Sequence, residues 1–568
     1  SANACSLKDV EHFARTLCEL LDIDSDFLIP AYEDSSSLIR EEAELPHNLS
    51  PSDERLKDPL QRARLSRLLD QGDLTRVAAW VLPIVWNHTG EAEGVWASAA
   101  WPLRRSHLFL QPGDSPAGLR LPLDSLPWRD EEDIEEDQPQ DPFAAGMMVR
   151  RDGRPSHQQP TDVRTIPHTA LCIELRDEIL HLFMPPVAKL DPYLDLLRCV
   201  EAAASAKDVQ LVLEGYDPPS DTRLHKLSVT PDPGVIEVNV HPSESWAQLS
   251  HVTELLYDKA KLLRLSTEKF MLDGKHTGTG GGNHVTLGAA KPVDSPFLRR
   301  PDLLRSLLIY WQRHPSLSYL FSGLFIGPTS QAPRVDEARD DNLYELEIAL
   351  SQLPLGDTER PWLVDRVLRN FLVDLTGNTH RAEFCIDKLY APGSASGRLG
   401  LVEMRAFEMP PHERMSLLQM LLIRALVAMF WDKPLEGNLV RWGTALHDRF
   451  MLRHFVQEDF SEVIGDLRRY GFPFSLSWFD AFFEFRFPRL GTMAVKDVRL
   501  ELHHALEPWH VLGEESGSQG TARFVDSSVE RLQVSVSGSS RGQYIVTCNG
   551  RRVPLVATSA DQLVGGVR

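Results

Sequence analysis

The chain has 568 residues, 42% of them hydrophobic, so it is long enough for two to four domains with cores of their own. Its 60 basic and 81 acidic residues give a net charge of −21, which repels nucleic acid and anionic membrane surfaces and requires a local basic pocket for any anionic substrate. Six cysteines without CxxC spacing argue against a zinc knuckle or a disulfide scaffold.

The N-terminus lacks a basic region followed by an apolar one, and no apolar run reaches the ~18 residues of a membrane span. We therefore expect a soluble, cytoplasmic protein that is not exported. The chain begins Ser1-Ala-Asn-Ala without a Met, which suggests a tag remnant or the C-terminal part of a longer protein.

The first part of the chain predicts an N-terminal α/β region over residues 1–129. Val10, Phe13, Leu17 and Leu20 recur at helical spacing and predict a helix over 7–24. A second, Arg-rich helix is expected over 60–69, and a strand-like stretch with several prolines over 101–128. The acidic run at 131–137 repels itself, which favours a solvated linker or insertion over 130–160.

Residues 161–450 alternate between strand and helix patterns and predict the central core of the chain. Strands are expected at 170–175, 179–184, 210–213, 235–240, 285–287, 381–386 and 399–407, and helices at 190–206, 255–270, 302–313, 343–353, 362–372 and 415–430. A helical and strand extension at 451–520 and a C-terminal β region at 521–568 follow. Because strands often succeed one another without a crossover helix, we expect an α+β fold with a largely antiparallel sheet.

The segment 273–284 holds a run of glycines between His276 and His284. Gly278, Gly280, Gly281 and Gly282 occur within five residues, and glycine is retained where the chain needs positive φ or approaches a ligand closely. The predicted elements on either side favour a binding loop over a flexible linker. Lys275 does not belong to a phosphate-binding Walker A sequence, because the required spacing is absent here.

Four predicted strands carry glutamates: Glu174, Glu237, Glu383 and Glu403. If these strands are neighbours, their carboxylates converge, and such an oxygen-rich cluster suits Mg²⁺ or Mn²⁺ rather than zinc. Arg176 and Arg405 share the strands and suit phosphate or carboxylate. Each strand alone is more typical of a solvated antiparallel sheet, but four of them beside a histidine-flanked glycine loop favour a site.

These motifs resemble those of the glutamine synthetase and glutamate-cysteine ligase superfamily of carboxylate-amine ligases. The resemblance rests on Gly-Val-Ile-Glu-Val-Asn at 234–239, the glycine loop ending in His284, and Val-Glu-Met-Arg at 402–405. The chain is more closely similar to the amidoligases whose longer bacterial members carry an N-terminal transglutaminase-like domain. That closer likeness spans about residues 13–531, with specific stretches at 268–273, 325–334, 441–448 and 507–510.

The resemblance implies a glutamine synthetase-like catalytic domain with a curved, largely antiparallel sheet flanked by helices. It implies that Glu174, Glu237, His284 and Glu403 bind the metal. Two positions depart from the pattern: Gly282 replaces an earlier histidine, and Arg176 stands where a second Glu is common. A missing ligand would come from His276, Glu345 or Glu347, for which a loop or helix-surface role is an equal alternative.

By the same resemblance, Arg334 stabilises phosphoryl transfer, and Glu403 and Arg405 complete the catalytic set. The alternative for Arg334 is a surface pair with Asp336 or Glu337. The implied nucleotide-binding residues are those of the glycine loop together with two arginines (Lys275, Gly278, Gly280, Gly281, Gly282, Arg176 and Arg405).

The resemblance implies ATP- and Mg²⁺- or Mn²⁺-dependent amide-bond formation through an acyl phosphate, on a peptide or modified amino acid. Metal-dependent amide hydrolysis without ATP and an inactive scaffold of the same fold stay open as alternatives. Transglutaminase activity is not expected within this chain, because no cysteine lies in an evident Cys, His, Asp arrangement. Implied partners are an ATP-grasp-like protein, an α-helical companion, an N-terminal-nucleophile peptidase, and an upstream transglutaminase-like domain.

Overall fold

The computed structural model describes most of the chain, and two compact units divide it after Asp221. The described residues are 5–33, 77–89, 92–103, 108–126, 166–219, 221, 223–224, 226–232, 235–270, 274, 276–278, 282–323, 326–328, 330, 332–337, 342–393, 397–508, 511–517, 520–525 and 530–568. Each unit has hydrophobic clusters of its own. The division falls inside the range 161–450 that the sequence pattern assigned to one core.

The first unit is built on a six-stranded sheet in the order β5-β1-β2-β6-β7-β8. Its strands are β1 (Ile29–Tyr32), β2 (Val77–Pro83), β5 (Leu108–Phe109), β6 (Ala170–Arg176), β7 (Ile179–Met184) and β8 (Leu211–Gly215). Neighbours are antiparallel except β1 with β5 and β7 with β8. A hairpin of β3 (Val85–Thr89) and β4 (Ala92–Ala97) accompanies the sheet.

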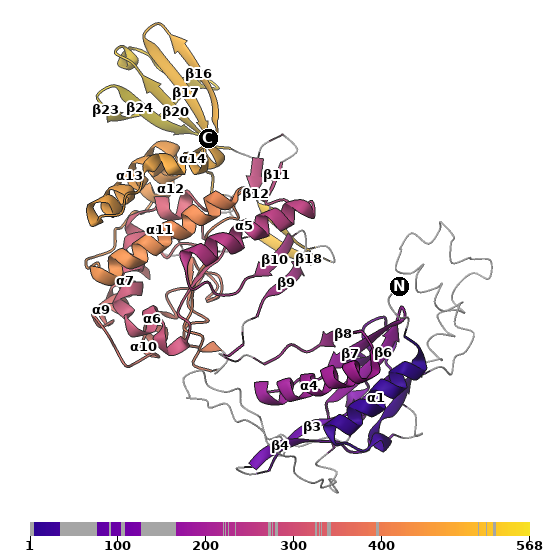
Figure 1. Ribbon diagram of the computed structural model, residues 1–568. Coiled ribbons are helices and arrows are strands. Elements are labelled where there is room, and N and C mark those ends of the chain that lie inside the picture. The colour runs from indigo at the N-terminus through magenta and orange to yellow at the C-terminus, as the bar shows by residue number, and fades with distance from the viewer. Residues whose placement is uncertain are drawn as a thin grey trace, which may run out of the picture. The chain divides into compact units, whose positions relative to one another are not determined.

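Helices α1 (Leu7–Leu21) and α4 (Leu190–Lys207) lie side by side in this unit (Figure 1). The first begins at a capping box, in which Ser6 and Asp9 satisfy each other's backbone N–H groups. Val10, Phe13 and Leu17 of α1 are buried in a cluster with residues of β6, β7 and α4. The amphipathic pattern therefore places one face of α1 on the core of the unit.

The core of the second unit is helical. Its helices are α5 (Trp246–Leu262), α6 (Pro296–Arg299), α7 (Pro301–Arg313), α8 (Ser316–Tyr319), α9 (Asn342–Ser351), α10 (Leu363–Leu368), α11 (Glu413–Asp432), α12 (Ala445–Phe450), α13 (Arg453–Tyr470) and α14 (Asp480–Arg486). Within the described part of the chain, α11 is the one helix long and apolar enough to cross a membrane. It contacts α5, α7 and α13 and buries Leu422, Ile423 and Leu426, as a core helix does.

The strands of the second unit form several separate sheets. A central one has the order β13-β15-β14, from β13 (Val285–Leu287), β15 (Val402–Met404) and β14 (Phe384–Cys385). Two-stranded sheets are β9 (Ser228–Asp232) with β10 (Val235–Asn239), β11 (Glu268–Phe270) with β12 (His276–Gly278), β18 (Val511–Gly517) with β19 (Gly520–Val525), and β21 (Thr547–Cys548) with β22 (Arg551–Arg552).

A five-stranded antiparallel sheet follows the last helices, in the order β16-β17-β20-β24-β23. Its strands are β16 (Arg489–Val495), β17 (Val498–His504), β20 (Leu532–Ser537), β24 (Gln562–Val567) and β23 (Val556–Ser559). In Figure 1 it lies at one end of this unit beside α14. The backbone N–H of His454 on α13 donates to the side chain of Gln533 on β20, which joins the sheet to the helices.

The mixed α+β class predicted from the sequence is confirmed, as are the helices over 7–24, 190–206, 302–313, 343–353 and 415–430 with small shifts of their ends. The described strands do not form the one curved sheet that we expected. The helix predicted over 255–270 is wrong in its second half: it ends at Leu262, and β11 follows. Leu262 and Leu263 are exposed, so the leucines that suggested a continuing helix have no core to face.

Further predictions concern the strand-like stretch 101–128, the helix over 60–69 and the acidic run at 131–137. The stretch 101–128 holds one two-residue strand and two 3₁₀ turns in its described residues, because prolines remove the ladder donors a strand needs. The helix expected over 60–69 and the acidic run at 131–137 lie outside the described residues.

We predict that Phe460→Ala destabilises the second unit strongly. Phe460 on α13 is fully buried, with its ring 4.7 Å from that of Phe479 and 5.9 Å from that of Phe321. Removing it leaves a cavity in the centre of the core, at a cost of about 3–5 kcal/mol. Denaturant unfolding measures the loss. The control Tyr344→Ala, on an exposed side chain of α9, should change the free energy of unfolding by less than about 0.5 kcal/mol; equal losses would contradict this account of the core.

Candidate functional site

The central sheet of the second unit carries a buried carboxylate with three nitrogen partners. Glu403 on β15 is 4% exposed. Its Oε1 lies 2.9 Å from Arg405 Nη1 and 3.1 Å from His284 Nδ1, and its Oε2 lies 3.3 Å from Lys388 Nζ. Three segments distant in sequence therefore meet at one carboxylate.

Strand register explains why these side chains meet. Glu403 pairs with Thr286 on β13 and with Cys385 on β14, so these three residues share one face of the sheet. The neighbouring row, Val285, Phe384 and Met404, is buried in the hydrophobic core. A slip of one residue would exchange the two rows, so the apolar row fixes which face carries Glu403.

Glu403 is held ionised. Burial by itself disfavours the charged form, but the hydrogen bond from His284 and the charges of Lys388 and Arg405 outweigh it and lower the pKa to about 2. Lys388 is half-exposed, whereas Arg405 is mostly covered. Lys388 and Arg405 bring two positive charges to one carboxylate, so the cluster is locally basic within an acidic chain.

His284 is positioned by the residues just before it. The N–H of Asn283 donates to the carbonyl of Phe407 at 2.8 Å, and its buried side-chain amide donates to Ser416 and Gln419 on α11. Gly282 forms a β-bridge with Glu408. A Cβ at Gly282 would lie 2.3 Å from Nε2 of His284, so the ring occupies the space that a side chain at 282 would need.

A second network of charges lies deeper in the core and is centred on Arg334. Its five N–H groups all donate within the protein, two to Asp336 and the others to Ser318 and the carbonyls of Trp311 and Gln312. Burial opposes its charge, but Asp336 raises its pKa further above the ordinary value. A contact between Arg334 and a phosphate would require breaking one of these bonds, so the geometry favours a role in holding the core together.

Glu383 and Glu337 belong to the same network. Burial raises the pKa of Glu383 to about 7, although the charge of Arg334 opposes the shift; its Oε1 accepts from Trp311 Nε1 at 2.9 Å. Glu337 accepts from Tyr319 at 2.6 Å and contacts His447 Nε2 at 3.1 Å. Its pKa is lowered in spite of burial, because these two partners favour the charged form. The backbone N–H of Arg405 donates to the carbonyl of Glu383 and connects this network to Glu403.

The structure brings Glu403, Arg405 and His284 of the predicted set together. Glu237 lies exposed on β10, where its carboxylate accepts a hydrogen bond from the side chain of Asn239. Glu174 and Arg176 pair with each other on β6 in the other unit, where Glu174 also accepts from the N–H of Ala117. Gly278 ends β12, whereas Lys275, Gly280 and Gly281 lie outside the described residues.

The residues considered as replacement ligands take other positions. Glu345 is exposed on α9, and Glu347 accepts from the N–H of Leu439 and pairs with Arg441. His276 lies on β12, paired in register with Phe270. Lys388 is a described partner of Glu403 that the sequence did not predict. It follows a two-residue strand, and no sequence periodicity marks a turn residue that faces a neighbouring strand.

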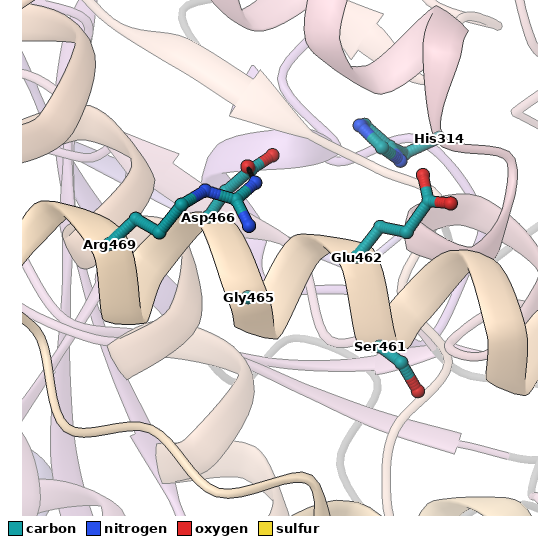
Figure 2. A pocket seen from close by; sticks show the side chains of 6 residues that line it. All are labelled: His314, Ser461, Glu462, Gly465, Asp466 and Arg469. Atoms are coloured by element: carbon teal, nitrogen blue, oxygen red, sulfur yellow. Dashed lines mark hydrogen bonds and ion pairs between the residues drawn. The ribbon is translucent and has the colours of Figure 1, made fainter.

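A separate surface recess of about 570 Å³ lies along α13, lined by His314, Ser461, Glu462, Gly465, Asp466 and Arg469. Figure 2 shows Glu462 on α13 facing His314, while Asp466 pairs with Arg469. Asp459 explains the arrangement, because one of its oxygens contacts His314 Nδ1 and the other accepts the N–H of Ser316. Both carboxylate oxygens of Asp459 therefore contact the turn between α7 and α8. The recess thus lies where α13 is joined to this turn.

The chain matches, over residues 1–568, the family described as "Putative amidoligase enzyme" (DUF2126), and it belongs to that family. No curated protein and no solved structure matches the chain. The sheet cluster of Glu403, His284, Lys388 and Arg405 therefore belongs to a protein of an amidoligase family, an enzyme family of ligase type.

We predict that Glu403→Gln removes an acid-sensitive part of the stability. The folded pKa of Glu403, about 2, lies below the ordinary value of 4.5, so its stabilisation is fully present above about pH 5 and is lost as the pH falls toward 2. The difference in unfolding free energy between wild type and variant should be on the order of 3 kcal/mol at pH 7 and should shrink steadily below pH 5.

Denaturant unfolding from pH 7 to pH 3 measures this difference, with exposed Glu345→Gln as the matched control. A difference that stays constant over the whole range would show that the carboxylate is not held ionised by its neighbours.

Proposed function

We propose that the second unit is an ATP- and Mg²⁺-dependent carboxylate-amine ligase and that the Glu403 cluster is its reaction centre. The observation that carries the proposal is the convergence of Lys388, Arg405 and His284 on one ionised carboxylate. In a chain with net charge −21, this cluster is a local concentration of cationic side chains of the kind that an anionic substrate requires. Membership of the amidoligase family supports the reaction class.

The donor set fits a divalent cation in part. His284 Nδ1 and Glu403 Oε1 lie 3.1 Å apart, close to the roughly 3.0 Å between adjacent ligands of an octahedral ion with bonds of about 2.1 Å. These two residues would hold Mg²⁺ or Mn²⁺, together with phosphate oxygens and water. When bound, the ion would neutralise charge that develops on the phosphoryl oxygens.

The protein's own residues then have separate tasks. Arg405 offers a planar guanidinium beside Glu403 and suits a phosphate or carboxylate oxygen. Lys388 is long and half-exposed, so it can leave Glu403 and follow an anionic substrate. When the substrate leaves, Lys388 and Arg405 pair with Glu403 again. Arg334 supports the site from behind, since its donors are already engaged.

In the proposed reaction, the substrate carboxylate attacks the terminal phosphorus of ATP, and ADP leaves. An amine then attacks the acyl phosphate, phosphate leaves, and an amide bond forms. Water must be excluded between the two steps, because an acyl phosphate hydrolyses. A peptide or amino-acid-derived substrate and a cytoplasmic location belong to the same proposal, as do the companion proteins that the resemblance implies.

We expect the wild-type chain to bind ATP in calorimetry only when Mg²⁺ or Mn²⁺ is present. Glu403→Gln should weaken this binding by more than tenfold, because it removes one proposed ligand and releases its cations. Gly282→Ala should also weaken ATP binding. The new Cβ would lie too close to the ring of His284, so this ring, rather than the backbone, must move. The matched control Glu345→Gln should bind as wild type does.

Well-folded wild type that binds no nucleotide would overturn the ligase proposal. Amide cleavage without ATP would instead favour a metal-dependent hydrolase, and nucleotide binding without turnover on any carboxylate and amine would favour a scaffold that has kept the fold.

A further inference from the structure

Three potential metal ligands converge beside β14. Sγ of Cys385 lies 4.0 Å from Nδ1 of His380, and the same nitrogen lies 3.6 Å from Oδ2 of Asp387. All three ligand atoms lie within 4.8 Å of one another. This cluster was not evident from the sequence, because residues spaced by five and two positions are brought together at a two-residue strand.

The local backbone holds these residues in place. Asp374 Oδ1 accepts from the N–H groups of Thr376 and Asn378 and closes the turn before His380. The side chain of Asn378 then accepts the N–H of His380 at 2.9 Å. After the strand, the N–H of Leu389 donates to the carbonyl of Ile386 and turns the chain back past Asp387. The ligands thus come from two ordered turns and the strand between them.

The arrangement does not have the geometry of a nucleophilic triad. A triad needs the thiol on one ring nitrogen of the histidine and the carboxylate on the other, whereas here both face Nδ1. Burial also raises the pKa of Cys385 to about 11, which is the reverse of an activated thiol. Convergence of a sulfur, a nitrogen and an oxygen on one point is instead what a bound cation requires.

We propose that His380, Cys385 and Asp387 form a binding site for a zinc-type divalent cation. A thiolate beside an imidazole and a carboxylate suits Zn²⁺ or Co²⁺ and disfavours Mg²⁺, a hard ion that binds thiolate poorly. The ligand atoms have to close in only slightly, since tetrahedral bonds of about 2.0–2.3 Å place ligands about 3.3–3.8 Å apart. The side chain of His380 is 54% exposed, so a cation there would have open positions for water or a substrate atom.

The surrounding charges are compatible with a cation. Arg369 lies 3.9 Å from Oδ1 of Asp387, but its main partner is Asp365, and it leaves Oδ2 facing His380. Glu403 lies on the neighbouring strand β15 and pairs with Arg405, which directly follows that strand. Cys385 stands directly opposite Glu403 in the sheet, so the zinc-type site would share a sheet face with the proposed reaction centre. It is a different site, with different ligands and a different metal preference.

The test is a Co²⁺ titration of the full chain after chelator treatment. Wild type should bind one equivalent and show the near-ultraviolet charge-transfer absorption of a cobalt thiolate, and Zn²⁺ should displace it. Cys385→Ser should abolish the band, while Cys548→Ser, at an exposed cysteine of the C-terminal region, should keep it. Absence of the band in wild type, or its persistence in Cys385→Ser, would overturn the proposal.

Two further variants keep the test decisive if Cys385→Ser fails to fold. His380→Gln and Asp387→Asn retain the thiol, and each should raise the Co²⁺ concentration needed for half-saturation by more than tenfold. His251→Gln, at an exposed position of α5, is the matched control and should bind as wild type does. Unchanged titrations of the first two variants would refute the site. No nucleotide is present, so the outcome is independent of the ligase proposal.

Discussion

The ionised state of Glu403 is the constraint on which the candidate site depends. A carboxylate that is 4% exposed is costly to keep charged unless partners compensate for its lost hydration. Here the partners come from three places: the segment before β13, the turn after β14, and β15 itself. The charge of Glu403 therefore links these segments, in addition to the backbone hydrogen bonds between them. The same partners are groups that bind anions, so the residues that compensate the charge of Glu403 are also those on which the proposed function depends.

In the network around Arg334, by contrast, the charges hold the core together. Every donor of Arg334 is engaged, and Asp336, Glu337 and Glu383 surround it within the core. Removing one member would leave a buried charge unpaired, which is more costly than removing both partners. Arg334 is thus suited to rigidity, whereas the side chain of Arg405 pairs with Glu403. The two arginines that the resemblance grouped as catalytic therefore have different partners and different surroundings.

The sequence predicted long elements well and short ones poorly. The pattern of Val10, Phe13 and Leu17 predicts α1 because one face of a long helix repeats many times. In contrast, β14 has two residues and β15 three, too few for any periodicity to reveal register. Glu403, Arg405 and His284 were found through motifs, but Lys388 and the pairing of Cys385 with Glu403 depend on register alone. Leu262 and Leu263 misled the prediction of a long helix, because apolar residues at helical spacing do not ensure a core to bury them.

One turn connects the two clusters of the sheet face. Asp387 and Lys388 are consecutive, yet the first faces His380 and the second faces Glu403. The turn that carries them is closed by the hydrogen bond between Leu389 and Ile386. Anything that fixes Asp387 therefore also restricts the backbone from which Lys388 reaches its carboxylate. A ligand at one cluster would reduce the conformational freedom that the other must lose on binding, which is a physical route to coupling without any large movement.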